Sequence, residues 1–128
     1  MIERIHVPGA PAPQGPYSPA VRAGDFVYVS GQGPIDPATG ELVSSDIEGE
    51  ARLTIENIRT ILEGCGSSLA DVFKCSVFVA DYRDFQAMNK VYSEYFGAAK
   101  PARTTVQATL VEPGMKIEID CVAYSPRK

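Results

Sequence analysis

Three side chains of this sequence stand where a reactive group could be placed. Arg103 follows Lys100-Pro101-Ala102, where a loop is expected to enter a strand. An arginine there could offer its guanidinium fork to a carboxylate, although an ordinary surface arginine would look the same. Glu118 could act as a general acid or base or hold a water molecule, or it could form only the polar side of an alternating strand. Tyr17 lies on a proline-rich loop, where a phenol could close a pocket or simply pack on the core.

Other kinds of site are poorly supported by the residue inventory. One histidine and three scattered cysteines without a C-x-x-C motif do not suit a zinc site. A Ser-His-Asp or Cys-His arrangement would have to use His6, close to the N-terminus. Gly31-Gln32-Gly33 is a lone G-x-G motif, and because no helix opens directly after it, a glycine-rich turn is the better interpretation. We therefore expect no metal site from the residues alone.

Length and composition indicate an ordinary globular protein. The 128 residues fit a single domain spanning 1–128, and the 45% hydrophobic and 22% charged residues are typical of a soluble fold. The net charge of −4 argues against a protein that mainly grips nucleic acid. No apolar run approaches the length of a membrane span, and the first residues lack the apolar stretch of a signal peptide. The odd number of dispersed cysteines suits small buried side chains in a reducing compartment, so a cytoplasmic location is expected.

The hydrophobic pattern predicts two helices between several strands. Strands are expected at residues 20–30 with a tight turn at 23–25, at 72–80, at 103–110 and at 115–124, with a short first strand at 2–6. The first helix should run from Ser45 to Gly64, opened by a capping box of Ser45 and Glu48. The second should begin near Asp84 and end at Gly97. Its apolar stripe should consist of Phe85, Met88, Val91, Tyr92, Tyr95 and Phe96.

Strands that alternate with helices predict an α+β fold, a mixed sheet with two helices packed on one face and a closing hairpin of the last two strands. Phe26-Val27-Tyr28-Val29 is apolar on both sides and should be covered on both. In the last strand, Ile117 and Ile119 alternate with Glu118 and Asp120. The sheet face that mixes these carboxylates with apolar groups is a candidate assembly surface.

Several segments, taken together and in order, resemble the RidA family (reactive intermediate deaminase A, also called YjgF). They are Gln14-Gly15-Pro16-Tyr17-Ser18-Pro19-Ala20, Val29-Ser30-Gly31-Gln32, Ile35-Asp36-Pro37-Ala38-Thr39-Gly40-Glu41, Asp84-Phe85-Gln86-Ala87-Met88-Asn89 and Pro101-Ala102-Arg103. The resemblance implies a chorismate-mutase-like fold and a homotrimer with a central β-barrel and ligand clefts between subunits. It implies hydrolysis of 2-imino acids, such as 2-iminobutanoate and 2-iminopropanoate, to 2-oxo acids and ammonia without a cofactor.

The resemblance also implies roles for individual positions. Arg103 matches the family arginine that holds the substrate carboxylate, and Glu118 matches the acidic residue near the hydrolytic water. Positions that line the pocket in the family are matched here by Tyr17, Ser30, Gly31 and Asn89, and Thr105 falls where the backbone contacts the ligand.

The sequence also departs from the family pattern at several places. Thr104-Thr105 replaces the commoner Ser-Cys, which removes a thiol but keeps the backbone. Pro113 comes one residue later than usual, which should reshape one wall of the cleft and change the preferred substrate size. Glu50 and Leu53 replace common glutamines, which we interpret as packing or surface variation.

Three other functions remain open at the level of the sequence. The same cleft could belong to a non-enzymatic trimer that captures a small carboxylate and reports it to a partner protein. A ribonuclease or translation inhibitor is also associated with the family, although the acidic charge and the single histidine weigh against it. The altered residues around Pro113 also leave room for a related deaminase that acts on an aminated dienoic acid.

Overall fold

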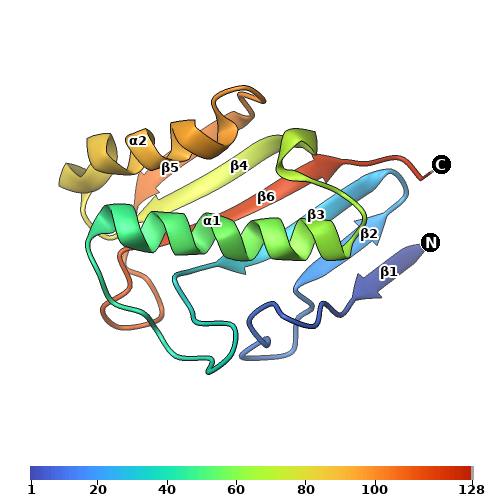
Figure 1. Ribbon diagram of the computed structural model, residues 1–128, viewed down its shortest axis with the longest axis horizontal. Helices are drawn as coiled ribbons and strands as arrows, with labels where there is room; N and C mark the ends of the chain where they lie inside the picture. Colours follow the sequence, from blue (N-terminus) through green and yellow to red (C-terminus); the bar gives the residue numbers. More distant parts are fainter. Residues whose placement is uncertain (128) are drawn as a thin grey trace.

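A six-stranded mixed sheet forms the body of the protein in the computed structural model, which describes residues 1–127. The strands lie in the order β1-β2-β3-β6-β4-β5, and all neighbours are antiparallel except β4 and β5. Figure 1 shows both helices on one side of this sheet. The bounds are β1 Ile2–Ile5, β2 Ala20–Ala23, β3 Phe26–Gln32, β4 Val72–Val79, β5 Ala102–Gln107 and β6 Ile117–Tyr124, with the helices α1 Ile47–Gly64 and α2 Phe85–Phe96. The predicted α+β fold class, with two helices on one face of a mixed sheet, is confirmed.

Helix α1 begins one residue later than its sequence suggested. Asp46 is the N-cap, and its carboxylate accepts a hydrogen bond of 2.8 Å from the Gly49 N–H. The predicted capping box of Ser45 and Glu48 is therefore wrong. The N–H of Ser45 donates instead to the buried carboxylate of Glu50 at 3.3 Å. A carboxylate one position later satisfies the same kind of free N–H, and a hydroxyl and a carboxylate side by side could not be ranked from sequence.

The second helix follows a short 3₁₀ turn at Tyr82–Asp84. Asp84 precedes α2 as predicted, but its side chain makes no capping hydrogen bond. The buried face of α2 carries Met88, Val91 and Phe96, in agreement with the predicted apolar stripe. This face packs on β4 and β5, so α2 covers the edge of the sheet that α1 does not cover (Figure 1).

The two faces of the sheet differ strongly. On the helix face, Ile117, Ile119, Cys121 and Ala123 of β6 are all buried, as the alternation predicted. Within the described part of the chain no helix lies over the opposite face, which is called the open face (Figure 1). Tyr28 and Tyr124 are 51% and 52% exposed on it. The prediction that residues 26–29 are covered on both sides is therefore wrong for the single chain.

The last two strands do not form the expected hairpin. β6 inserts between β3 and β4, while β5 pairs in parallel with β4 at the edge of the sheet. β5 also ends at Gln107, three residues earlier than predicted, because the chain then leaves the edge to reach the centre of the sheet. Within residues 1–127, no helix combines the length and the apolar character needed to cross a bilayer.

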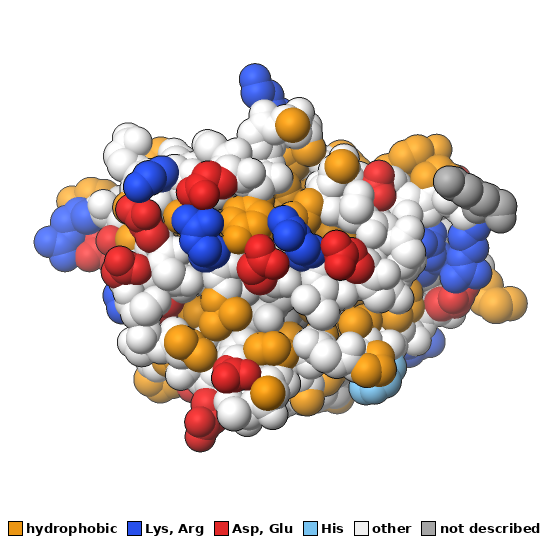
Figure 2. Space-filling model, viewed as in Figure 1, with side chains coloured by type: hydrophobic (Ala, Val, Ile, Leu, Met, Phe, Trp, Pro, Cys, Tyr) orange, Lys and Arg blue, Asp and Glu red, His pale blue; other side chains and the backbone are white. Residues whose placement is uncertain are grey.

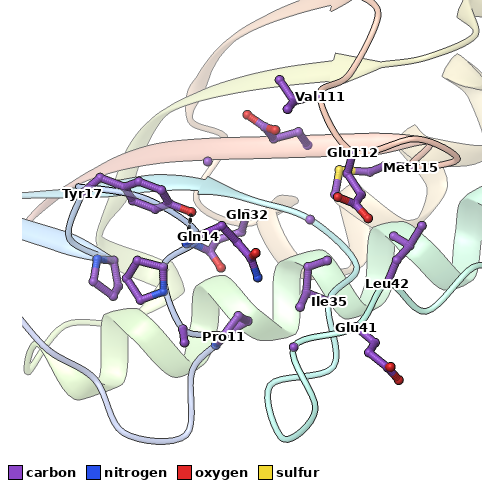
Figure 3. A pocket seen from close by; sticks show the side chains of 17 residues that line it. Pro11, Gln14, Tyr17, Gln32, Ile35, Glu41, Leu42, Val111, Glu112 and Met115 are labelled. Carbon is purple, nitrogen blue, oxygen red and sulfur yellow. Dashed lines mark hydrogen bonds between the residues drawn. The ribbon is translucent and has the colours of Figure 1, made fainter.

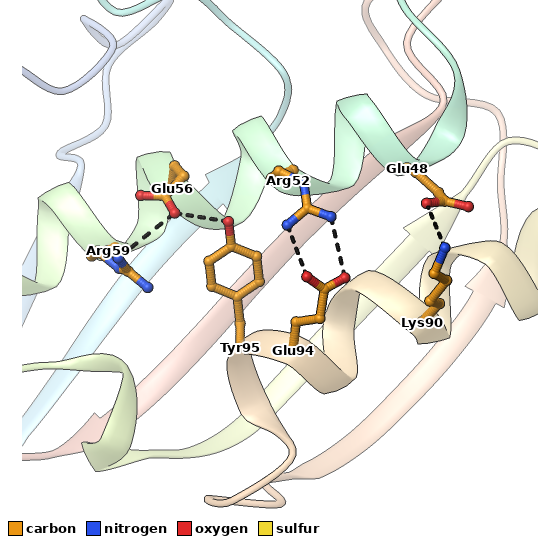
Figure 4. Close-up of polar contacts among 7 residues, drawn as sticks. All are labelled: Glu48, Arg52, Glu56, Arg59, Lys90, Glu94 and Tyr95. Atoms are coloured by element: carbon orange, nitrogen blue, oxygen red, sulfur yellow. Dashed lines mark hydrogen bonds and ion pairs between the residues drawn. The ribbon is translucent and has the colours of Figure 1, made fainter.

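Charged side chains join the two helices on the solvent side. Arg52 of α1 binds Glu94 of α2 through two hydrogen bonds of 3.1 and 3.2 Å, and Lys90 pairs with Glu48 at 3.3 Å. Figure 4 shows these contacts, and Figure 2 shows the acidic and basic side chains alternating across this face. We call this set the helix surface network; its members are Glu48, Arg52, Glu56, Arg59, Lys90, Glu94 and Tyr95.

Candidate functional site

Arg103 lies on the edge strand β5 and points to the helix face of the sheet. Its guanidinium carbon is 4.7 Å from the ring centroid of Tyr92 and 5.6 Å from that of Phe85, both on α2. Among residues 1–127, the structure gives the Arg103 side chain no hydrogen bond and no ion pair. Cation–π contacts orient a guanidinium group through its face, and the N–H donors in the guanidinium plane stay free. Arg103 is therefore positioned by aromatic rings and available to an anion.

Three buried oxygen atoms without partners among the described residues lie on the faces of α2 and β5 that carry Arg103 and its aromatic contacts. Phe85, Asn89 and Tyr92 follow one another at helical spacing on one face of α2, and Thr105 shares the face of Arg103 on β5. The Asn89 amide oxygen, the Tyr92 hydroxyl and the Thr105 hydroxyl are all buried without a hydrogen-bond partner among the described residues. Burial, with the neighbouring Cys75 as a further cause, raises the pKa of Tyr92 well above its usual value, so the phenol stays neutral. The five residues form what we call the Arg103 group.

A second group lies around a cavity of about 630 Å³ that Arg103 does not line. Tyr17, Gly31 and Glu118 all line it, together with apolar side chains from several loops. Figure 3 shows Ile35, Leu42 and Met115 around the same hollow. Tyr17, Ser30, Gly31 and Glu118 are called the Glu118 group.

The Glu118 carboxylate lies directly against the backbone of Gly31. A Cβ atom built on Gly31 would collide with the Glu118 carboxylate, so any other residue at position 31 would displace it. Burial, and to a lesser extent the nearby carboxylate of Asp120, raises the pKa of Glu118 above its ordinary value. A half-buried carboxyl group with a raised pKa can accept and return a proton closer to neutral pH.

The proline-rich loop reaches this cavity through Tyr17. The Tyr17 hydroxyl accepts a hydrogen bond of 3.1 Å from the Gln14 N–H, and its ring stays half-exposed at the rim. Ser30 does not line the cavity itself; its hydroxyl donates to the Ser18 carbonyl oxygen at 2.6 Å. Ser30 thus ties β3 to the loop that carries Tyr17.

The two groups do not meet within one chain. The β6 residues beside Glu118 point under the helices, so Glu118 itself points to the open face. Arg103 contacts α2 on the helix face, and β4 separates β5 from β6. The structure therefore brings Tyr17, Gly31 and Glu118 together, with Ser30 behind them, and brings Asn89, Arg103 and Thr105 together elsewhere.

Two side chains of the Arg103 group were not identified from the sequence. Phe85 and Tyr92 were expected only as members of the apolar stripe of the second helix. Their spacing of seven residues puts them on one helix face, but nothing in the sequence says that β5 packs against that face. Cys75 and Cys121 are buried as expected, whereas Cys65 is only half-buried.

Comparison with known proteins gives a consistent result along the whole chain. Residues 8–125 match the family model described as Endoribonuclease L-PSP. A RutC family protein of Pyrococcus horikoshii is 49% identical over 124 residues, which cover 97% of this chain and 98% of that protein. The chloroplastic Reactive Intermediate Deaminase A of Arabidopsis thaliana is 37% identical over 121 residues, which cover 94% of this chain and 65% of that protein. The crystal structure of E. coli TdcF with bound serine is 36% identical, with a TM-score of 0.88 over 98% of this chain and 99% of that one.

Proposed function

This chain belongs to the RidA (YjgF) family, whose family model is described as Endoribonuclease L-PSP, and on that premise we propose that it is a 2-imino acid deaminase. Its substrates would be small imines such as 2-iminobutanoate and 2-iminopropanoate, and its products 2-oxo acids and ammonia. The relative named as a reactive intermediate deaminase and the structural neighbour with bound serine, a small amino acid, support this substrate class.

The observation that carries the proposal is the free guanidinium of Arg103. It stacks on Tyr92 and Phe85 and has no anion partner among the described residues. The carboxylate of a 2-imino acid matches its paired N–H donors, and each charge-assisted hydrogen bond contributes about 1.5–3 kcal/mol. Asn89 and Thr105 share the faces of α2 and β5 that carry Tyr92 and Arg103, so we expect these two positions to line the same ligand.

Glu118 is proposed to direct water at the imine carbon. A protonated imine is already electrophilic, so the site needs mainly to place a water about 3 Å from that carbon. As the C–O bond forms, Glu118 takes a proton from the water, and the C=N electron pair moves to nitrogen to give a carbinolamine. Glu118 then passes the proton to the amine. The C–N bond then breaks while the ionised Glu118 takes the proton of the hydroxyl, which releases the 2-oxo acid and ammonia; the proton leaves Glu118 with ammonia as ammonium.

The proposed site is shared between two copies of the chain in a homotrimer with a central barrel. The Arg103 group and the Glu118 group lie on opposite faces of one sheet, so one chain supplies only half of the site. The open face also carries exposed aromatic rings: Phe26 lies 5.9 Å from Phe73 and 5.6 Å from Tyr124, between ring centroids. Association of copies through this face would remove these rings from water.

A coupled trapping assay tests the activity. A threonine dehydratase generates 2-iminobutanoate in the presence of semicarbazide, with and without the purified protein. We expect the wild-type protein to slow semicarbazone formation and the Arg103→Ala variant to have no effect. If the wild-type protein is inactive although light scattering shows a trimer, the deaminase proposal fails and the cleft is better explained as a carboxylate-binding site.

The family description supplies a second candidate, an endoribonuclease. Cleavage of RNA commonly uses paired acid and base groups on a basic surface, whereas this chain has a net charge of −4 and one histidine. His6 is exposed and does not line the cavity. Incubation of the same preparation with labelled RNA tests this function, and cleavage that survives Arg103→Ala would separate it from imine hydrolysis.

A further inference from the structure

The buried face of α1 carries three polar side chains in a row. Glu50, Thr54 and Asn57 are spaced by four and three residues and are 0%, 0% and 3% exposed. Polar groups so deeply buried are costly unless they are hydrogen-bonded, so each needs a reason. Glu50 and Asn57 have hydrogen-bond partners, and these partners lie at the edge of the cavity beside Glu118.

Asn57 holds the chain where it leaves β3. Its side-chain amide donates to the carbonyl oxygens of Gly33 at 3.1 Å and Ile35 at 2.8 Å. Both of these residues line the cavity, and Gly33 lies two positions after Gly31. Both amide hydrogens of Asn57 are therefore used to fix the exit of β3, defined here as Gln32–Ile35.

Glu50 holds the chain where it enters β6. Its carboxylate accepts a hydrogen bond of 2.8 Å from the Lys116 N–H and pairs with the Lys116 ammonium at 3.2 Å. Lys116 lies two positions before Glu118, and its neighbour Met115 lines the cavity. Glu50 thus fixes the entry of β6, defined as Met115–Ile117. Glu50 was interpreted as packing or surface variation, and its fully buried side chain excludes the surface alternative.

The sheet alone does not hold these two strands in register at this end. The pairing of β3 with β6 shifts between Val29 and Gln32, where β3 carries one extra residue, and no pair follows Gln32 with Ile119. A bulge leaves a residue unpaired and loosens the ladder locally. It falls at Ser30 and Gly31, the segment that Glu118 lies against. The exit and the entry also touch, because a Cβ on Gly33 would collide with the Met115 side chain.

We infer that Asn57 and Glu50 are positioning residues that keep the Glu118 carboxylate over Gly31, by holding β3 and β6 on either side of the bulge. This inference rests on the proposed imine hydrolysis. Because the two residues act on the end of the site that carries the water, they determine the rate of the chemical step. Binding of the substrate carboxylate depends on Arg103, which lies on another strand and contacts neither residue.

Kinetics of three variants test the inference, with Thr54→Val as the matched control. Thr54 lies between the other two on the same buried face, but its hydroxyl has no hydrogen-bond partner among the described residues. We expect Asn57→Ala to lower kcat by about 10- to 100-fold with KM within about twofold, since a displacement of about 1 Å can cost 10²-fold. Because Glu50→Gln keeps an acceptor for the Lys116 N–H, its kcat should fall by only about three- to tenfold. Thr54→Val should match the wild type.

Two further measurements separate positioning from loss of structure and from failure of the proposed function. Thermal unfolding and light scattering show whether each variant is folded and assembled at the assay temperature. In a ¹⁵N-labelled chain, Asn57→Ala should shift the backbone amide signals of Gly31 and Glu118, while Thr54→Val should not. These amide signals can be measured whether or not the protein is catalytically active. Unchanged signals and unchanged kcat in Asn57→Ala and Glu50→Gln would overturn the inference, as would a rise in KM at constant kcat. An inactive wild type with shifted signals would overturn the proposed function and leave the positioning role standing.

Discussion

The helix surface network and the candidate site contain the same kinds of side chain, but the charges are paired in the network and unpaired in the site. In the network, Arg52 lies 6.0 Å from the Tyr95 ring centroid and also binds Glu94 through two hydrogen bonds (Figure 4). In the site, Arg103 lies 4.7 Å from the Tyr92 ring centroid and binds no carboxylate of the described chain. Both aromatic rings come from α2, three residues apart. An arginine that is stacked but unpaired is the one prepared for an external anion.

The carboxylates of the two regions show the same contrast. The hydrogen bonds from Arg52 lower the pKa of Glu94, which is therefore ionised and satisfied on the surface. Among residues 1–127 Glu118 has no basic partner, and burial raises its pKa. Charges neutralise each other at the helix surface, whereas Arg103 and Glu118, the two charged groups of the proposed site, lie on opposite faces of the sheet. This separation keeps both groups free for a substrate.

The largest expected effect comes from Arg103→Ala. Loss of two charge-assisted hydrogen bonds of about 1.5–3 kcal/mol each should lower kcat/KM by about 10²- to 10⁴-fold. Arg52→Ala is the matched control, since it removes an arginine with the same aromatic contact and should leave kcat/KM unchanged. Steady-state imine hydrolysis measures both. Equal losses in the two variants would break the comparison between paired and unpaired arginines.

Glu118→Gln should lower kcat by at least about 10²-fold, because positioned proton transfer contributes about 10²–10⁴-fold. The ionised carboxylate is the active form, so wild-type activity should fall as the pH drops through the raised pKa of Glu118. The stability of the fold should change with pH in the opposite direction to the activity. A carboxyl group whose pKa is raised on folding favours the fold while protonated and disfavours it as the pH rises.

The stability of this variant is therefore a second readout of the same feature. Glu118→Gln should raise the unfolding temperature slightly at neutral pH and leave it unchanged in acid. Glu94→Gln, its counterpart in the surface network, should instead lower the unfolding temperature at neutral pH, since the pKa of Glu94 is lowered on folding. Calorimetry across pH checks both signs, and a shift in the same direction for the two variants would contradict the contrast between these carboxylates.

Loss of the aromatic contact to Arg103 should have an intermediate effect. Tyr92→Leu removes a cation–π contact of about 0.5–2 kcal/mol, so KM should rise by about 2- to 30-fold. Tyr92→Phe keeps the ring and should rescue most of this loss. Tyr95→Leu removes the equivalent ring of the surface network and should leave KM as it is. A rise in KM that Tyr92→Phe does not rescue would assign the effect to the buried hydroxyl instead.

The smallest effect is expected for the surface network itself. Exposed ion pairs contribute about 0–1 kcal/mol, so Arg52→Ala should lower the free energy of unfolding by no more than that amount. Chemical denaturation at low and at high salt measures it, and the difference from the wild type should shrink as salt screens the pair. A loss above about 2 kcal/mol would show that this network does more than ordinary surface pairing.

The sequence predicted the fold class and most elements because hydrophobic periodicity is a local property. Alternation in residues 117–124 placed Ile117 and Glu118 on opposite faces, and the structure agrees. Strand pairing is not local, so the insertion of β6 between β3 and β4 was missed in favour of a hairpin. The uncovered ring of Tyr28 was missed for a related reason, since an apolar residue on an exposed sheet face has the same sequence pattern as a core residue.

In the candidate site, too, some residues were identified from the sequence, whereas contacts that depend on tertiary packing were missed. Arg103 and Glu118 were proposed from their residue types and the family resemblance, and their roles remain predictions. The aromatic contacts of Arg103 depend on the packing of β5 against α2, and the role of Glu50 depends on Lys116, 66 residues away. Neither pairing leaves a periodic or spacing signal in the sequence. A glutamate on the helix face that also carries Ile47, Ile58 and Ile61 is the clue that could have drawn attention to Glu50.

The central claim is that each site combines Arg103 of one chain with Glu118 of another, and subunit complementation tests it most directly. The Arg103→Ala and Glu118→Gln variants are assayed alone for imine hydrolysis and then after joint unfolding and reassembly. The two preparations should be nearly inactive alone, and the mixed assembly should regain about a quarter of the wild-type activity, because random mixing joins one intact half from each variant in that share of the sites. If the mixture stays as inactive as its parents while wild-type chains treated in the same way recover full activity, the site lies within one chain and the claim is wrong.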